Sequence, residues 1–191
     1  MTIRLRHLAE LIAPGAGIGA VAGVAAVGLA LAAGQPVGWA LATGFGLGLP
    51  MVLAGAGFGL LLANGILSPG VFAPTALFWL VAFPLTRLSH EVLAGLLIAG
   101  RPALPPDVFG FLVYQALISV GFAIGFSWLH ERIAPHWFRR IQHHNPRAER
   151  LYLFYLRHAE AQWKARESRR RARATARATG RPALSRTGPK E

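Results

Sequence analysis

The 191-residue sequence contains no cysteine, which excludes disulfides, iron–sulfur clusters and catalysis by a thiolate. Acidic residues are also few: 8 Asp+Glu stand against 20 Lys+Arg, giving a formal net charge of +12. Charge of either sign is scarce in the first 130 residues, which hold seven Asp, Glu, Lys and Arg residues in all. The remaining 61 residues hold 16 Lys+Arg and 5 Asp+Glu. An apolar part and a strongly basic part therefore meet near Glu131.

Long apolar runs fill the first part. A membrane helix needs ~20 mostly apolar residues to cross a hydrocarbon core of ~30 Å. Such runs predict an all-α integral membrane protein with four transmembrane helices, at residues 11–33, 37–63, 71–99 and 108–129. We expect a transmembrane domain over residues 1–130, a juxtamembrane amphipathic and basic helical tail over 131–178, and a disordered C-terminus over 179–191.

The third span is irregular. Its 29 residues, 71–99, would measure ~43 Å as one straight helix, more than the bilayer core. Two interpretations follow: one long tilted helix, or a span that ends near Arg87 and continues as a short interfacial helix over residues 88–99, with Pro84 providing the bend. We favour the long helix, because the last segment is too short to cross alone.

Positive charge predicts the orientation. Arg132, Arg139 and Arg140 follow the fourth span, and Arg4 and Arg6 precede the first, whereas the stretch from the third span to the start of the fourth holds only Arg87 and Arg101. Arginine and lysine near the span ends mark the cytoplasmic side. We therefore expect a multi-pass protein of the cytoplasmic membrane with both termini in the cytoplasm. An even number of spans places the termini on the same side, in agreement with the charges.

A cleaved signal peptide is an alternative for the N-terminus. Arg4 and Arg6, the apolar run and the small residues Ala30 and Ala32 fit such a peptide and its cleavage site. The run is longer and richer in glycine than a typical signal core, so we favour a retained span.

Glycines recur near one face of the first two predicted spans. They are Gly15, Gly19 and Gly23 in the first span and Gly44, Gly48, Gly55 and Gly59 in the second. Small residues at this spacing let helix backbones approach closely. Because the two spans form a hairpin, we expect these faces to pack together, and the functional alternative is a glycine-zipper pore or rotor. Gly121 and Gly125 repeat the spacing in the fourth span.

The glycine-rich stretch 15–19 resembles the corresponding helix of rotary ATP synthase c-subunits. That family carries its ion on a carboxylate in the second helix, and residues 37–63 contain no ionisable side chain. The resemblance therefore implies no rotary function for this chain.

Arg87, His90 and Glu91 are the polar candidates within the apolar part. Their spacing of i, i+3 and i+4 places them on one helix face, where Arg87 and Glu91 can pair and His90 can titrate near neutral pH. Charges inside a span usually face protein or water because lipid exposure is costly. This face is either a proton, ion or head-group site, or an interfacial ion pair, which we favour. Tyr114, Gln115 and Ser119 of the fourth span are candidate neighbours.

No catalytic or metal motif accompanies these residues. Four histidines follow the fourth span, at positions 130, 136, 143 and 144, but their spacing is not that of HExxH, and Pro135 is expected to interrupt any helix there. Walker A, dinucleotide-binding and Ser–His–Asp patterns are also lacking. We expect no metal, no cofactor and no enzyme activity.

The tail carries the basic residues expected to contact lipid or phosphate, namely Arg139, Arg140, Arg169, Arg170, Arg171 and Arg173. Each basic residue near an anionic leaflet gains ~1 kcal/mol, so anionic head groups are the favoured partner. Nucleic acid or the ribosome is the second choice, because arginine-rich segments also bind phosphate backbones.

Together these patterns predict a small non-enzymatic membrane anchor or organising protein with a lipid-facing basic cytoplasmic tail. Its partners would be the bilayer and a second copy or another membrane protein. The alternative is a small oligomeric transporter or channel that uses the face of Arg87, His90 and Glu91; an intramembrane enzyme ranks third.

Overall fold

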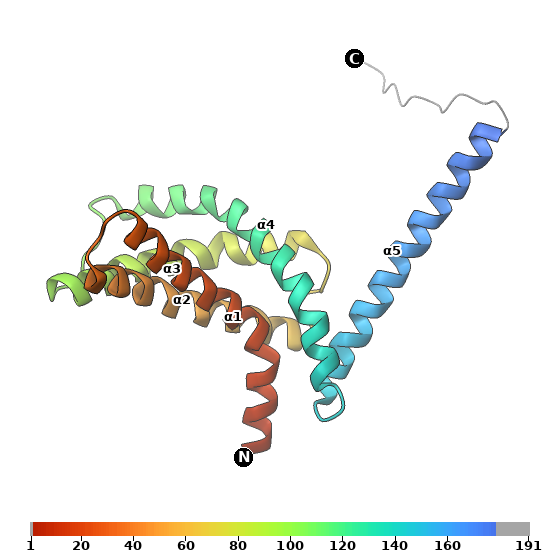
Figure 1. Ribbon diagram of the computed structural model, residues 1–191, viewed down its shortest axis with the longest axis horizontal. Coiled ribbons are helices and arrows are strands. Elements are labelled where there is room, and N and C mark those ends of the chain that lie inside the picture. The colour runs from red at the N-terminus through yellow and green to blue at the C-terminus, as the bar shows by residue number, and fades with distance from the viewer. Residues whose placement is uncertain (1, 179–191) are drawn as a thin grey trace. The chain divides into compact units, whose positions relative to one another are not determined.

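The described part of the chain, residues 2–178 of the computed structural model, consists of helices joined by loops and contains no strand (Figure 1). Its helices are α1 (Thr2–Ala32), α2 (Val37–Ala63), α3 (Phe72–Ala99), α4 (Val108–Ile141) and α5 (Pro146–Ala178). The first four are long and apolar enough to cross a membrane, as the hydropathy predicts. The predicted disordered segment 179–191 lies outside the described residues.

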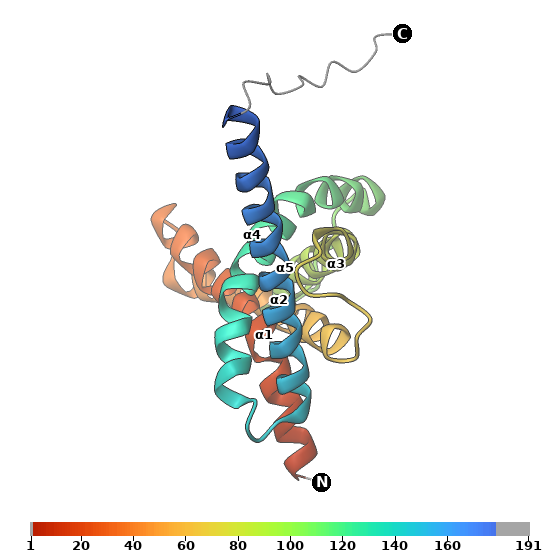
Figure 2. The ribbon, with the colours of Figure 1, turned by 90° about the vertical axis from the view of Figure 1, so that its right-hand side faces the viewer.

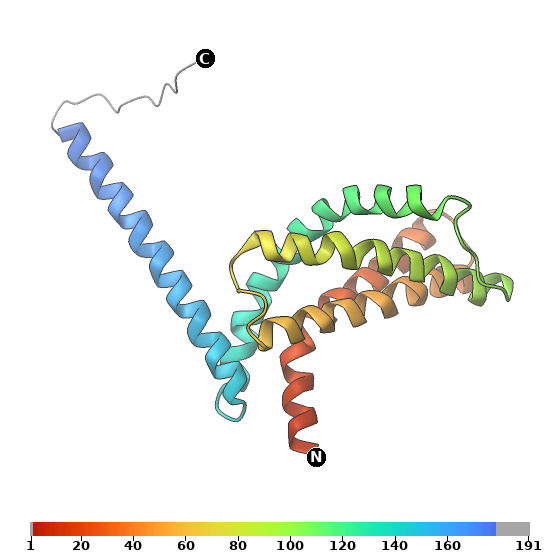
Figure 3. The ribbon, with the colours of Figure 1, turned by 180° about the vertical axis from the view of Figure 1, so that it is seen from behind.

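The chain divides into two compact units, Met1–Tyr152 and a second unit whose described residues are 153–178. Helices α1–α4 and the first turns of α5 belong to the first unit. Within it, the α1–α2 turn and the α3–α4 loop lie at one end of the helical bundle, and the α2–α3 loop lies at the other (Figures 1 and 3). The four helices therefore run alternately up and down.

Helix α4 differs from expectation at its C-terminal end. Pro135 was expected to interrupt the helix, but α4 continues through it to Ile141, so the domain boundary expected between residues 130 and 131 falls inside a helix. Proline removes one backbone hydrogen bond and costs ~3 kcal/mol in a helix interior. The neighbouring Ala134 and Phe138 are both fully buried. Tertiary packing on both sides of Pro135 stabilises the helix against that cost.

Helix α3 is continuous from Phe72 to Ala99, with Pro84 inside it, rather than a span joined to an interfacial helix. It ends at Gly100, whose φ of 68° is in the left-handed region, where glycine is favoured because it has no Cβ. The backbone N–H of Gly100 closes the helix by donating to the carbonyl of Leu96.

Helices α1 and α2 pack along their glycines. A Cβ on Gly23 would lie 2.7 Å from Cα of Gly48 and 2.9 Å from the carbonyl oxygen of Gly44, and a Cβ on Gly59 would lie 2.9 Å from Cα of Ile12. Backbone therefore meets backbone along this contact. In α4, by contrast, a Cβ on either Gly121 or Gly125 would meet no atom within 4 Å.

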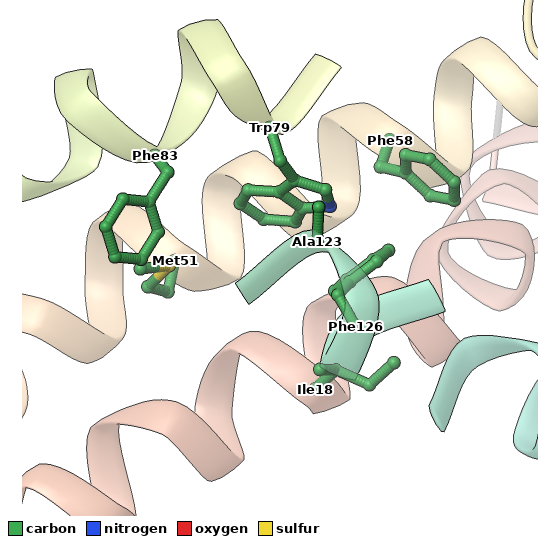
Figure 4. Close-up of a cluster of buried hydrophobic side chains, with 7 residues drawn as sticks. All are labelled: Ile18, Met51, Phe58, Trp79, Phe83, Ala123 and Phe126. Carbon is green, nitrogen blue, oxygen red and sulfur yellow. The ribbon is translucent and has the colours of Figure 1, made fainter. Parts of the chain in front are cut away.

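An aromatic cluster forms the centre of the bundle, and all four helices contribute to it. Figure 4 shows its buried side chains pointing into the space between the helices: Ile18, Met51, Phe58, Trp79, Phe83, Ala123 and Phe126. Trp79 is fully buried, with its ring centroid 4.7 Å from that of Phe126. Phe58 meets Phe126 edge-on at 4.9 Å. Each aromatic pair adds ~0.5–1.5 kcal/mol beyond burial of its area.

The outer faces of the four helices are also apolar. Large hydrophobic side chains that stay exposed include Val24, Leu29, Leu53, Leu77, Phe109 and Leu117, each with more than half of its surface accessible. Exposed apolar surface on this scale is unusual for a protein in water and needs a covering medium or partner.

Candidate functional site

Arg87, His90 and Glu91 form a single cluster on α3, here named the Arg87 triad. Nη2 of Arg87 donates to Oε1 of Glu91 at 3.1 Å, and Nη1 of Arg87 contacts Nδ1 of His90. An arginine can only donate, so Nδ1 of His90 is the acceptor in this contact. Nδ1 of His90 also lies 3.6 Å from Oε1 of Glu91. The three side chains thus interact with one another.

Helix α2 makes room for the triad at Gly46. A Cβ on Gly46 would lie 3.4 Å from Cδ2 of His90 and 3.4 Å from the backbone nitrogen of Ala94. The absence of a side chain lets the imidazole, whose side chain is 12% exposed, pack against the α2 backbone. Sequence reasoning missed Gly46, because its neighbour in α3 is far along the chain.

An apolar groove of about 460 Å³ lies beside the triad. It is lined by Leu49, Pro50, Leu53, Leu88, Ser89, Val92, Leu93 and Leu104. Arg87 compensates the charge of Glu91, so the triad carries no net charge while His90 is neutral. Because Arg87 already pairs with Glu91 within α3, the carboxylate offers little attraction to a free cation.

The three α4 residues predicted to lie near the Arg87 triad differ in burial. Ser119 is buried and donates to the carbonyl oxygen of Ala116 in its own helix at 2.6 Å. Gln115 is buried, and Tyr114 is 60% exposed. None of the hydrogen bonds found among the described residues joins these side chains to the triad.

The four histidines after the predicted fourth span occupy unlike environments. His130 is buried and its ring stacks on Phe126 at 5.6 Å. The Nδ1 atom of His136 lies 2.9 Å from the carbonyl oxygen of Arg132. The rings of His143 and His144 are 5.0 Å apart and nearly perpendicular.

A second polar cluster, missed from the sequence, joins the start of α1 to the end of α4; Figure 2 shows the two segments side by side. Its centre is Glu10. The Glu10 carboxylate accepts hydrogen bonds from Arg6 Nε at 3.0 Å, from His144 Nε2 at 3.0 Å and from Asn145 Nδ2 at 3.2 Å. Its carbonyl oxygen accepts from Trp137 Nε1 at 2.7 Å. We call these residues, together with His7, the junction.

Asn145 is the fully buried member of the junction. Its Nδ2 also donates to the carbonyl oxygen of His7 at 3.0 Å, while its Oδ1 accepts from the backbone N–H groups of Arg147 and Ala148. One side chain therefore caps α5 and fastens it to α1. The sequence offered two signals: an isolated acid at the start of the first span, and Asn-Pro as a helix start.

The six arginines predicted to contact lipid or phosphate are all exposed. Arg139 and Arg140 lie in the last turn of α4. The other four lie on α5, where Arg171 pairs with Glu167 at 3.0 Å. Two turns earlier in α5, Lys164 donates a hydrogen bond to Glu160 and lowers the pKa of that carboxyl.

The chain matches no known protein-family model, no curated protein and no solved structure. Neither the Arg87 triad nor the junction therefore inherits a role from a relative. Their functions rest on their own contacts and charges.

Proposed function

We propose that this protein is a multi-pass, non-enzymatic anchor of the cytoplasmic membrane, which holds the basic helix α5 at the inner leaflet. The observation that carries the proposal is the contrast between the apolar outer faces of α1–α4 and the exposed, polar surface of α5. In α5, the residues from 156 to 166 are exposed except for His158, and so are the four basic residues Arg169, Arg170, Arg171 and Arg173.

The composition of α1–α4 supports insertion into a bilayer. Side chains such as Leu29, Leu53 and Leu117 are exposed on the isolated bundle, and a hydrocarbon phase would cover them. The polar groups of the Arg87 triad bond to one another, which lowers the cost of placing them within a span.

The positions of the basic residues support an orientation with both termini in the cytoplasm. Arg4 and Arg6 lie at the start of α1, and Arg139 and Arg140 at the end of α4. The junction brings these two helix ends together. A further hydrogen bond joins the α2–α3 loop to α4, because the backbone N–H of Gly70 donates to the carboxylate of Glu131 at 2.7 Å. Hydrogen bonds thus connect α1, α4 and the α2–α3 loop at the end of the bundle where α5 begins.

The contacts of α5 support a role as an exposed helix that is available to bind the membrane surface. Pairs at i and i+4, Glu160–Lys164 and Glu167–Arg171, stabilise the helix locally. From residue 164 to residue 178, α5 carries no large apolar side chain, and a helical segment that is polar on all sides is not built to enter a core. Arg169, Arg170 and Arg173, which make no ion pair with any described residue, would each gain ~1 kcal/mol beside an anionic leaflet and so draw the helix toward it at moderate salt.

Transport through the Arg87 triad is the second candidate. Three ionisable groups within a predicted span favour a transport function. The ion pair between Arg87 and Glu91 argues against it, because the charge of the Glu91 carboxylate is already neutralised. A double variant in which Arg87 and Glu91 are both replaced by glutamine separates the two functions.

The lipid assignment of α5 can be tested on the full chain in liposomes. Because the protein has no cysteine, Ser168→Cys provides one site for an environment-sensitive fluorophore. We expect a blue shift of its emission in liposomes that contain phosphatidylglycerol but not in pure phosphatidylcholine, and reversal by high salt. Replacing Arg169, Arg170, Arg171 and Arg173 with glutamine should abolish the shift, whereas replacing them with lysine should preserve it.

Two outcomes would overturn the assignment. One is identical emission in both lipid compositions. The other is displacement of the helix from anionic liposomes by RNA at physiological salt, which would identify a nucleic acid as the preferred partner.

A further inference from the structure

A basic pocket of about 670 Å³ opens beside the junction, within the unit Met1–Tyr152. The lining residues come from the start of α1 and the start of α5: Arg4, His7, Leu8, Leu11, Asn145, Pro146, Arg147 and Arg150. The pocket thus brings together three arginines and a histidine from segments more than 130 residues apart. No pattern in the sequence predicts this grouping.

The three arginines of the pocket are available to a ligand. Arg4, Arg147 and Arg150 are exposed, and none of them makes an ion pair with any described residue. The nearby acid of the junction, Glu10, is already bonded by Arg6, His144 and Asn145. The positive charge of the pocket is therefore left uncompensated by the junction.

The arginine side chains, rather than the end of helix α5, are the anion-binding groups. Pro146 has no backbone N–H, and the N–H groups of Arg147 and Ala148 already bond to Oδ1 of Asn145. Three guanidinium groups remain, and each can donate two parallel hydrogen bonds to a phosphate.

The pocket also has an apolar side. Leu8 is half-buried and Leu11 is 1% exposed, and both belong to α1 where it passes from the basic N-terminus into its apolar run. A free phosphate would gain nothing from leucine side chains. A phospholipid would place its phosphate at the arginines and the first carbons of its acyl chains against the leucines.

We infer that this pocket binds the head group of an anionic phospholipid, with the phosphate held by Arg4, Arg147 and Arg150. The inference rests on the proposed membrane insertion with the N-terminus at the inner leaflet. It goes beyond the general attraction of α5 to lipid, because it assigns one stoichiometric site on the first unit.

Native mass spectrometry of the full chain in an uncharged mild detergent tests the site. The probes are dioleoyl phosphatidylglycerol, dioleoyl phosphatidylcholine and glycerol phosphate. We expect one retained phosphatidylglycerol, and a loss of affinity of about fivefold for each arginine removed, or about a hundredfold for Arg4→Gln/Arg147→Gln/Arg150→Gln. The matched control, Arg101→Gln/Arg157→Gln/Arg166→Gln, removes the same charge from exposed arginines outside the pocket and should retain the lipid.

Equal loss in the pocket variant and the control would overturn the site, since it would indicate diffuse attraction to the basic chain. So would retention of glycerol phosphate as tightly as the lipid, or equal retention of phosphatidylcholine. If the triple variant does not fold, Leu8→Trp, which fills the apolar side and leaves every charge in place, should still reduce lipid retention. Failure of the membrane proposal is seen separately, as full-length protein in the soluble fraction of cells.

Discussion

Gly15 of α1 and Gly55 of α2 face each other so closely that a Cβ added to either would overlap the carbonyl oxygen of the other. The obstacle in both directions is backbone, which cannot rotate away as a side chain would. The contact between the first two helices therefore depends on the absence of two particular side chains.

Adding a methyl group at this contact should separate the helices. We predict that Gly15→Ala and Gly55→Ala each lower the free energy of unfolding by about 1–3 kcal/mol, the usual cost of overpacking. Unfolding by SDS titration from a mild detergent measures the change. Gly17→Ala and Gly57→Ala are matched controls two residues away, where a Cβ would meet no atom within 4 Å. Equal destabilisation by the controls would refute the role of close backbone contact.

The junction should contribute a comparable amount through Asn145. We predict that Asn145→Ala costs about 1–3 kcal/mol, because it removes a helix cap and leaves partly buried hydrogen-bonding groups of His7 and Glu10 without this partner. The same SDS titration applies. Asn64→Ala is the control, since the Asn64 side chain is exposed and bonds only locally to Leu60, and it should change stability by less than about 0.5 kcal/mol. A neutral effect of Asn145→Ala would mean that the junction does not hold α5 to α1.

The Arg87 triad should behave as a coupled pair. Glu91→Gln and Arg87→Gln each leave one charge without its partner and should each destabilise by about 1–3 kcal/mol. The double variant should be more stable than the sum of the single effects predicts, with a coupling energy of about 0.5–3 kcal/mol. Additive single effects would show that the ion pair contributes nothing.

The same double variant distinguishes anchoring from transport. An anchor needs the triad only for packing. We therefore expect the folded double variant to localise normally, and its fluorophore at Ser168→Cys should respond to lipid as it does in the protein with an unaltered triad. A protein that is stable and correctly localised but loses its cellular phenotype would instead identify the triad as a transport site.

Trp79 should be the most sensitive position in the core. Trp79→Ala removes a fully buried ring that contacts three phenylalanines, and it should cost about 3–5 kcal/mol by thermal or SDS unfolding. Trp79→Phe should cost much less, because the lost Nε1 atom is buried without a hydrogen-bond partner among the described residues. Trp39→Ala, at a position 53% exposed, should be close to neutral. Similar losses at both tryptophans would argue against the observed core.

Local patterns in the sequence predicted the features that depend on neighbouring residues. The four apolar runs became four long helices, because hydropathy over ~20 residues is a property of one segment. Arg87, His90 and Glu91 came together because residues three and four apart share a helix face.

Features that join distant segments could not be predicted in this way. Trp137 bonds to Glu10 across 127 positions, and Asn145 bonds to His7 across 138. The continuation of α4 through Pro135 was likewise missed, because it depends on burial of Ala134 and Phe138 by the tertiary fold rather than on helix propensity. In each case packing outweighed the local preference.

The orientation of the four helices is the central claim, and single-cysteine labelling tests it most directly. The chain has no native cysteine, so each variant reports on one position: Gln35→Cys, Ser68→Cys, Pro102→Cys or Ser168→Cys. With a membrane-impermeant maleimide, Gln35→Cys and Pro102→Cys should be labelled in cells whose inner membrane is intact, and Ser68→Cys and Ser168→Cys only after that membrane is opened. Labelling of Gln35→Cys and Ser168→Cys from the same side would contradict the four-span membrane anchor.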